Sequence, residues 1–169
     1  MGLRTEIEGM VWPYPDVFVV EREQIREFAA AVKALDRASF YEPAARELGY
    51  PALIAPLTFA AKFALLIQQH FFRHVDLGID AKPIFHVDQA FRYHRPLISG
   101  DTLRGTLYIE SVKDRFDMTI VTTRSACTDK NEKPVLETLT TLMVHDGDPS
   151  IDLKRDPQTG QYRRASDAS

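Results

Sequence analysis

The spacing of apolar residues changes from helical to alternating near the middle of the chain. In EREQIREFAAAVKAL, apolar residues recur at i, i+3, i+4 and i+7, which predicts an amphipathic helix over 21–34. Pro43 and Gly49 bracket a second, short helix over 43–48. A long helix is predicted over 57–75, with Thr58 placed to satisfy free backbone amides at its start. Its apolar residues cover most of the circumference, so we expect other elements to wrap around it.

The residues after this helix alternate between apolar and polar, as β-strands do. The first strand, IFHVDQAFRY, is predicted to place one set of apolar side chains on a single face: Phe85, Val87, Phe91 and Tyr93. The other face would carry His86, Asp88, Arg92 and, just beyond the strand, His94. Three further strands follow in TLRGTLYIESV, MTIVTTRSACT and PVLETLTTLMV, and VFVV at 17–20 is another candidate. The connecting loops are short, which indicates an antiparallel sheet.

Together these elements predict an α+β architecture, in which a curved antiparallel sheet of about five strands wraps around the long helix of residues 57–75. This is the hot-dog fold. We expect a single hot-dog domain over 1–146 and a polar, partly disordered surface tail over 147–169. One such domain leaves a sheet edge uncovered, so we also expect it to pair with a second domain into one continuous sheet.

Composition narrows the classes of function. The chain has 169 residues and a net charge of −3, which argues against non-specific electrostatic binding of nucleic acid. Cys127 is the only cysteine, so we expect no disulfide within the chain, no metal site and no cofactor. The N-terminus lacks the pattern of a secretory signal, and the most apolar segment has too many polar side chains to span a membrane. We therefore expect a cytoplasmic protein, with Cys127 acting as a small buried hydrophobic residue.

A carboxylate and an aromatic side chain stand five residues apart in LDRASFY, at Asp36 and Tyr41. This spacing would suit an acid and base pair if the second residue were a histidine. Imidazole, with an ordinary pKa of about 6.5, is a good base near neutral pH, whereas a phenol, with an ordinary pKa of about 10, is a poor one. Asp36 can equally cap a helix, and Tyr41 can be a packing residue.

Several phrases of the sequence resemble one enzyme family. HRPLISGDTL is similar to the strand, turn and strand of the MaoC-like, R-specific enoyl hydratases and dehydratases. YPDVFVVEREQIREFAAAVK, LGYPALIAPLTF, VDQAFRYHRPLISGDTL and TLTTLMV resemble more closely the A/C-type subunits of the mycobacterial (3R)-hydroxyacyl-ACP dehydratase. The likeness covers about residues 5–145, and the tail phrase LKRDPQTGQ favours the C-type over the A-type subunit.

The resemblance implies where a catalytic site would lie. Catalytic members of the family carry an aspartate and a histidine, spaced D-x-x-x-x-H, on the loop after the first helix. The matching positions here are Asp36 and Tyr41, so the resemblance implies a chain without its own catalytic base. It also implies a substrate-binding role for the entrance to the long helix, APLTF. A plain helix N-terminus would have the same sequence.

Two further positions are candidates from the residue pattern. Gln89 is polar on an otherwise apolar strand face, so we expect it to hydrogen-bond near the helix or to a ligand. Phe63 stands among alanines, which would either leave an acyl channel between helix and sheet or allow tight packing. The candidate substrate-binding residues are therefore Pro56, Leu57, Thr58, Phe59, Phe63 and Gln89.

Three functions remain open at this point. The first is the acyl-chain-binding subunit of a heterodimeric (3R)-hydroxyacyl-ACP dehydratase in type II fatty acid (mycolic acid) elongation, with the partner subunit supplying the catalytic Asp and His. Acyl carrier protein or coenzyme A would deliver its substrate. The second is a self-sufficient homodimeric enoyl-thioester hydratase or thioesterase that uses Asp36 with His86. The third is a non-catalytic acyl-thioester binding module. Neither nucleic acid nor a membrane is expected as a partner.

Overall fold

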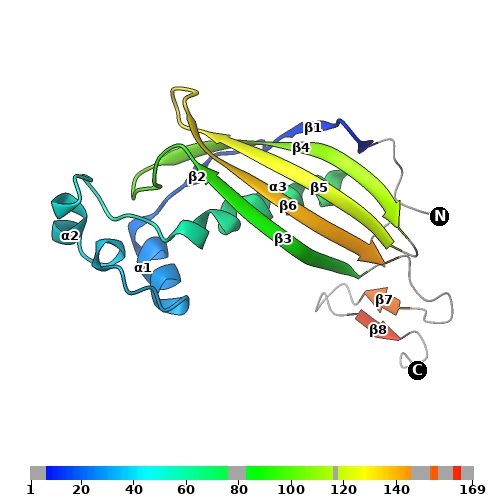
Figure 1. The fold of residues 1–169 in the computed structure, drawn as a ribbon, viewed down its shortest axis with the longest axis horizontal. Coiled ribbons are helices and arrows are strands. Elements are labelled where there is room, and N and C mark those ends of the chain that lie inside the picture. The colour runs from blue at the N-terminus through cyan, green and yellow to red at the C-terminus, as the bar shows by residue number, and fades with distance from the viewer. Residues whose placement is uncertain (1–6, 76–82, 116–117, 146–152, 156–161, 165–169) are drawn as a thin grey trace.

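The computed structural model describes residues 7–75, 83–115, 118–145, 153–155 and 162–164. The helical elements are α1 (Arg22–Ala31), η2 (Arg37–Ser39), α2 (Glu42–Glu47), η3 (Leu57–Ala60) and α3 (Ala61–His74). The strands are β1 (Val11–Pro13), β2 (Phe18–Val19), β3 (Ile84–Tyr93), β4 (Thr102–Arg115), β5 (Met118–Thr128), β6 (Pro134–His145), β7 (Leu153–Arg155) and β8 (Tyr162–Arg164). The long strands curve around α3, and α1 and α2 lie together beyond the N-terminal end of α3 (Figure 1).

The three predicted helices are present; the first is shorter than predicted, and the second has the predicted length but begins one residue earlier. The long helix begins differently from the prediction, because its first turn, η3, is a 3-10 helix that precedes α3. The residue before this turn is Pro56, and no side chain caps it. Thr58 lies within the turn and is exposed, so the predicted capping role of Thr58 was wrong.

The main sheet is antiparallel, with strand order β1-β4-β5-β6-β3 and with β2 also paired to β4. Its four long strands are those predicted from the alternating pattern. β1 was not predicted, and it makes the sheet six-stranded rather than about five-stranded. This strand is three residues long and ends at a proline, so its sequence carries too little alternation to be recognised. β3 ends the order, so its second edge pairs with no strand in the described part of the chain.

A β-bulge in β3 changes which side chains face α3. Pairing with β6 shifts register between His86 and Asp88, so that Val87 is an extra residue. His86 pairs with the inward-facing Leu142, whereas Phe85 points outward and is exposed. The prediction that Phe85 and Val87 share the inner face with Phe91, and that His86 faces away, was therefore wrong. An alternating sequence continues through a bulge, so the pattern cannot reveal the change of phase.

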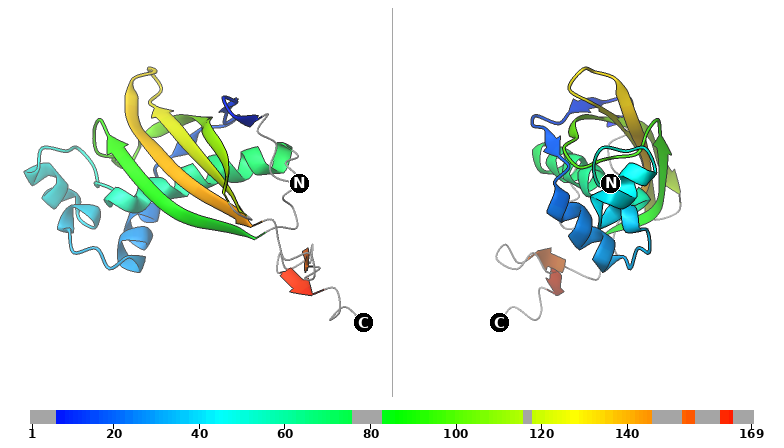
Figure 2. Two further views of the ribbon diagram at one scale, coloured as in Figure 1. Left: turned by 45° about the vertical axis from the view of Figure 1, so that its right-hand side comes forward. Right: turned by 90° about the vertical axis from the view of Figure 1, so that its left-hand side faces the viewer.

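The core lies between α3 and the concave face of the sheet, and the long helix crosses beneath the strands (Figure 2). Phe63 and Ile67 of α3 are buried against β4, where Gly105 leaves room for them. The helix is not wrapped on all sides as expected. Leu65 and Leu66 remain exposed on the side of α3 that the core does not cover.

Part of the predicted tail over 147–169 is described. β7 and β8 form a small antiparallel sheet of their own, which the sequence did not predict. The remaining tail residues lie outside the described residues, and so does the prediction that the tail is partly disordered. Among the helices that the structure describes, none is both long and apolar enough to cross a membrane.

Candidate functional site

Asp36 and Tyr41 flank the short turn that follows α1. The Asp36 carboxylate accepts a hydrogen bond from the Ala38 backbone N–H at 2.9 Å, and thereby caps η2. In the described part of the chain no imidazole hydrogen-bonds to this carboxylate. Tyr41 precedes α2 and is 59% exposed, with the Arg37 guanidinium 5.9 Å from its ring centroid. The pair therefore forms a helix cap and a surface residue, not a base held beside an acid.

The entrance to the long helix is braced from the sheet. The Tyr93 hydroxyl donates a hydrogen bond to the Leu57 carbonyl, and burial raises the pKa of Tyr93 to about 12. This hydroxyl therefore remains a proton donor at any physiological pH. The Phe59 N–H donates to the Pro56 carbonyl at 2.8 Å, whereas the first amides of a helix, here those of Leu57 and Thr58, have no acceptor within the helix. The N-terminus of η3 thus presents backbone donors and the positive end of the helix dipole.

The two candidate phenylalanines lie in the core. Phe63 stacks on Phe18, with ring centroids 4.9 Å apart, and Phe59 packs edge-on against Phe28 at 5.4 Å. Both are fully buried, and neither lines the cavity described next. Of the six candidate substrate-binding residues, Gln89 is the one that does.

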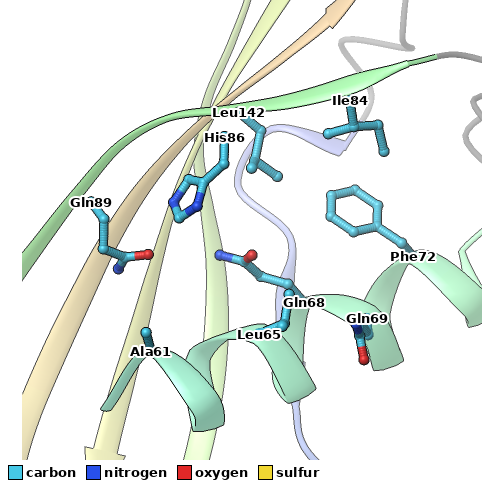
Figure 3. A pocket seen from close by; sticks show the side chains of 9 residues that line it. All are labelled: Ala61, Leu65, Gln68, Gln69, Phe72, Ile84, His86, Gln89 and Leu142. Atoms are coloured by element: carbon cyan, nitrogen blue, oxygen red, sulfur yellow. The ribbon is translucent and has the colours of Figure 1, made fainter. Parts of the chain in front are cut away.

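A cavity of about 350 Å³ lies between α3 and β3. Its lining residues are Ala61, Leu65, Gln68, Gln69, Phe72, Ile84, His86, Gln89 and Leu142. Helix and strand form opposite walls, and the side chains of Gln68, His86 and Gln89 point toward one another across the space (Figure 3). The remaining wall is mostly apolar, so the arrangement can hold an apolar chain beside a small group of hydrogen-bonding side chains.

Local structure explains how these polar groups reach the cavity. The bulge at Val87 turns the His86 side chain toward α3. After the bulge, Gln89 also faces inward and pairs with Thr140. The Gln89 side-chain N–H donates to the Leu139 carbonyl at 3.2 Å, while its Oε1 accepts from the Thr140 hydroxyl at 3.2 Å. Gln68 lies on the buried side of α3. The sequence analysis did not select Gln68 as a site residue. Its position four residues after Ala64 and three before Phe71, on an apolar face of the helix, was the available signal.

Comparison with known proteins places the chain in a family. A family model described as "FAS1-like, dehydratase domain region" matches residues 9–138. This chain belongs to the FAS1-like dehydratase domain family. Relatives of this FAS1-like chain include a UPF0336 protein of Mycobacterium tuberculosis, 49% identical over 98% of this chain and 100% of the relative. A UPF0336 protein of Mycobacterium leprae is 48% identical over the same shares of both chains.

Solved structures confirm the predicted hot-dog fold and the MaoC-like resemblance of this FAS1-like dehydratase domain. The C-terminally truncated HadBC (3R-hydroxyacyl-ACP dehydratase) complex of Mycobacterium tuberculosis contains a chain that is 51% identical. That match has a TM-score of 0.78 and covers 83% of this chain and 99% of that one. A MaoC-like dehydratase is 28% identical with a TM-score of 0.77, and the match covers 86% of this chain and 44% of that one.

Proposed function

We propose that this chain is the acyl-chain-binding, stabilising subunit of a heterodimeric (3R)-hydroxyacyl-ACP dehydratase, in which a partner hot-dog chain supplies the catalytic aspartate and histidine. The pathway would be type II fatty acid elongation toward mycolic acids. One observation carries the proposal: Tyr41 occupies the position of the expected base and lies on the surface, while a mostly apolar cavity opens beside a free sheet edge. The 51% identity to a chain of the HadBC complex supports this assignment.

The cavity is of a size that suits a fatty acyl chain. At about 30 Å³ per methylene-sized group, roughly the share of one water molecule, about 350 Å³ holds roughly ten such groups. Each methylene removed from water contributes about 0.8 kcal/mol, which makes an apolar chain a favourable occupant. Leu65 and Ile84 line the cavity and are also partly exposed, so its open side lies where α3 and β3 meet solvent.

The free edge of β3 is the proposed docking surface for the partner. The backbone groups along this edge pair with no strand among the described residues, so they can extend the sheet into a second chain. Exposed apolar side chains lie along this edge and on the helical residues next to it: Leu57, Leu65, Ile84, Phe85 and Val87. An exposed apolar surface of this kind marks an interaction site. A second hot-dog chain, paired edge to edge through β3, would cover this surface and close the cavity.

The proposed division of chemistry follows from what elimination requires. A base must remove the C2 proton, an acid must protonate the departing C3 hydroxyl, and the thioester oxygen must be stabilised as it gains charge. The partner's aspartate and histidine would perform the proton transfers. The self-sufficient alternative has less support, because His86 lines the cavity whereas Asp36 caps η2 and does not line it.

Activity measurements test the division of roles. The chain alone should not hydrate a crotonyl or dodecenoyl thioester, whereas its complex with a D-x-x-x-x-H hot-dog chain should. Asp36→Asn in this chain should leave turnover by the complex within about threefold, because asparagine also caps a helix. Replacing the histidine of the partner's motif should abolish turnover. Substantial turnover by the isolated chain that survives Tyr41→Phe would refute the proposal.

Interface variants test the docking surface. Phe85→Glu places a charge on an outward-facing side chain of β3 that is 51% exposed in this chain. The matched control is Leu35→Glu, which places the same charge on a residue that is 96% exposed after α1. Light scattering after co-expression should show a heterodimer for the control and separated chains for Phe85→Glu. A stable homodimer that never exchanges with the partner chain would instead favour the non-catalytic acyl-thioester binding module.

A further inference from the structure

Three polar side chains from two elements meet at one place in the wall of the cavity. Gln68 comes from α3, while His86 and Gln89 come from β3 on either side of the bulge. We call these three residues the polar trio. Figure 3 shows their side chains converging from the two walls, with Ala61, Leu65 and Leu142 around them. An acyl chain in this cavity must therefore run past the polar trio.

Two threonine hydroxyls behind the polar trio hold its amides in place. Thr123 of β5 and Thr140 of β6 are paired residues whose side chains are fully buried beneath the helix. The Gln68 side-chain N–H donates to the Thr123 hydroxyl at 3.4 Å, and the Thr123 hydroxyl in turn donates to the Thr140 carbonyl at 3.5 Å. The Thr140 hydroxyl donates to Gln89 Oε1, so the two glutamines belong to one connected network.

This network leaves hydrogen-bonding capacity directed at the cavity. Gln68 is only 6% exposed, yet among the described residues its Oε1 has no hydrogen-bond donor. Each glutamine also has a second side-chain N–H beyond the one used in the network. Laying methylene groups against such atoms carries the penalty of burying unsatisfied polar groups. A plain alkyl chain is therefore a poorer match for this part of the cavity than a chain with an oxygen at that depth.

We infer that the polar trio is a hydrogen-bonding subsite for a hydroxyl or carbonyl oxygen of the acyl ligand. A ligand hydroxyl would donate to Gln68 Oε1 and accept from a Gln89 N–H or the His86 ring. The inference rests on the proposed acyl-binding function and adds a selectivity that the function does not require. The oxygen has two possible sources: the 3-hydroxyl next to the thioester, or a substituent farther along the chain.

Calorimetric titration of the full-length chain with four coenzyme A thioesters tests the inference. The ligands are dodecanoyl, 3-hydroxydodecanoyl, 8-hydroxydodecanoyl and 12-hydroxydodecanoyl. At least one hydroxylated ligand should bind about tenfold more tightly than dodecanoyl, because a site built to bond a hydroxyl discriminates against the analogue that lacks it. Tighter binding of the 3-hydroxy ligand identifies the head of the substrate as the source. Tighter binding of either of the others identifies the chain.

Variants assign any preference to the polar trio. Gln68→Leu should remove the preference for the hydroxylated ligand and leave dodecanoyl binding equal or tighter. The matched control is Gln24→Leu, the same change at a residue of α1 that does not line the cavity. It should leave the preference unchanged. Gln89→Met provides a second test, should Gln68→Leu fail to fold.

The possible failures are distinguishable. If none of the four ligands binds, the proposed acyl-binding function fails, and the subsite with it. If dodecanoyl binds as tightly as every hydroxylated ligand, the subsite is refuted while the acyl-binding function stands. The same holds if the preference persists in both Gln68→Leu and Gln89→Met. Water filling the polar end of the cavity would produce these two results.

Discussion

Replacing Gly105 by alanine should destabilise the chain, because α3 packs onto β4 at a point that leaves no room for a methyl group. A β-carbon at position 105 would lie 2.4 Å from Ile67 Cδ1 and 2.8 Å from Phe63 Cζ. Both side chains are fully buried in the core, so neither can swing into solvent. Gly105 is not among the residues with positive φ, so the backbone itself accepts alanine.

The expected magnitude combines two opposing effects. Overpacking a core costs about 1–3 kcal/mol, while the smaller unfolded-state entropy of alanine offsets about 0.4–1 kcal/mol, which leaves a net loss of about 1–2 kcal/mol. For a chain of this size the melting temperature should fall by about 2–8 °C. Ile67→Val removes the nearest carbon and should cost about 1 kcal/mol in the natural background. In the Gly105→Ala background, Ile67→Val should cost much less.

Urea unfolding of the four proteins in this cycle measures the coupling between the two positions. Crowding predicts that the double variant is more stable than the sum of the single changes, by more than the roughly 0.5 kcal/mol within which independent sites add. Additive effects, or a Gly105→Ala variant that is more stable than the natural chain, would contradict the close approach of helix and sheet at β4.

Two further predictions concern the turn before β4 and the C-terminal end of α3. Asp101→Ala removes a bidentate ion pair, in which the two terminal nitrogens of Arg95 lie 2.7 and 2.8 Å from the Asp101 carboxylate oxygens. It also removes the hydrogen bond that the Ile98 N–H donates to this carboxylate. Urea unfolding should show a loss of about 2 kcal/mol, whereas Glu110→Ala, which breaks the more exposed pair with Arg124, should cost under about 1 kcal/mol. The pKa of His70 is lowered from its ordinary value of 6.5, first by burial and next by the positive charges of His74 and Arg73. The Nδ1 atom of His70 accepts a hydrogen bond from the Trp12 indole N–H at 2.9 Å. Because its pKa is lower in the folded chain, His70 binds a proton more readily in the unfolded chain. The stability that neutral His70 contributes is therefore present above about pH 6.5 and is lost as the pH falls through the lower folded pKa. Unfolding followed by Trp12 fluorescence should show this loss as the pH is lowered from above to below the ordinary histidine pKa of about 6.5, and His70→Gln should reduce it. An unchanged pH dependence in that variant would show that His70 is not responsible.

The elements of the fold were predictable because each has a strong local period. The long helix is apolar over most of its surface, and the strands after it alternate and are joined by short loops, which together specify a sheet curved around a helix. The bulge at Val87 was not predictable, since a single extra residue leaves the alternation of the sequence intact. His86 was assigned to the outer face for that reason, whereas Gln89 was selected correctly as an inward-facing polar residue.

The cavity could not be predicted from the sequence, because it depends on where the helix sits within the curved sheet. The alanines near the start of α3 were compatible with either a channel or a filled core. The structure contains both arrangements at different strands: the core is filled at β4, where Gly105 admits Phe63 and Ile67, and a cavity remains at β3. The glycine and the bulge lie on strands that follow one another in the sequence but are separated by β5 and β6 in the sheet, and the contrast between them determines where an acyl chain would fit.

The positions of Asp36 and Tyr41 explain how the chain can keep the aspartate of the D-x-x-x-x-H pattern without its histidine. Asp36 has a structural role that needs no histidine, because its carboxylate caps the turn that leads into α2. Tyr41 lies on the surface, and neither residue lines the cavity, so a residue other than histidine at position 41 leaves both the core and the cavity unchanged. Under the proposed function, catalysis and acyl binding therefore belong to different parts of the fold. A chain can lack the first and keep the second, provided that a partner brings its own acid and base to the open side of the cavity.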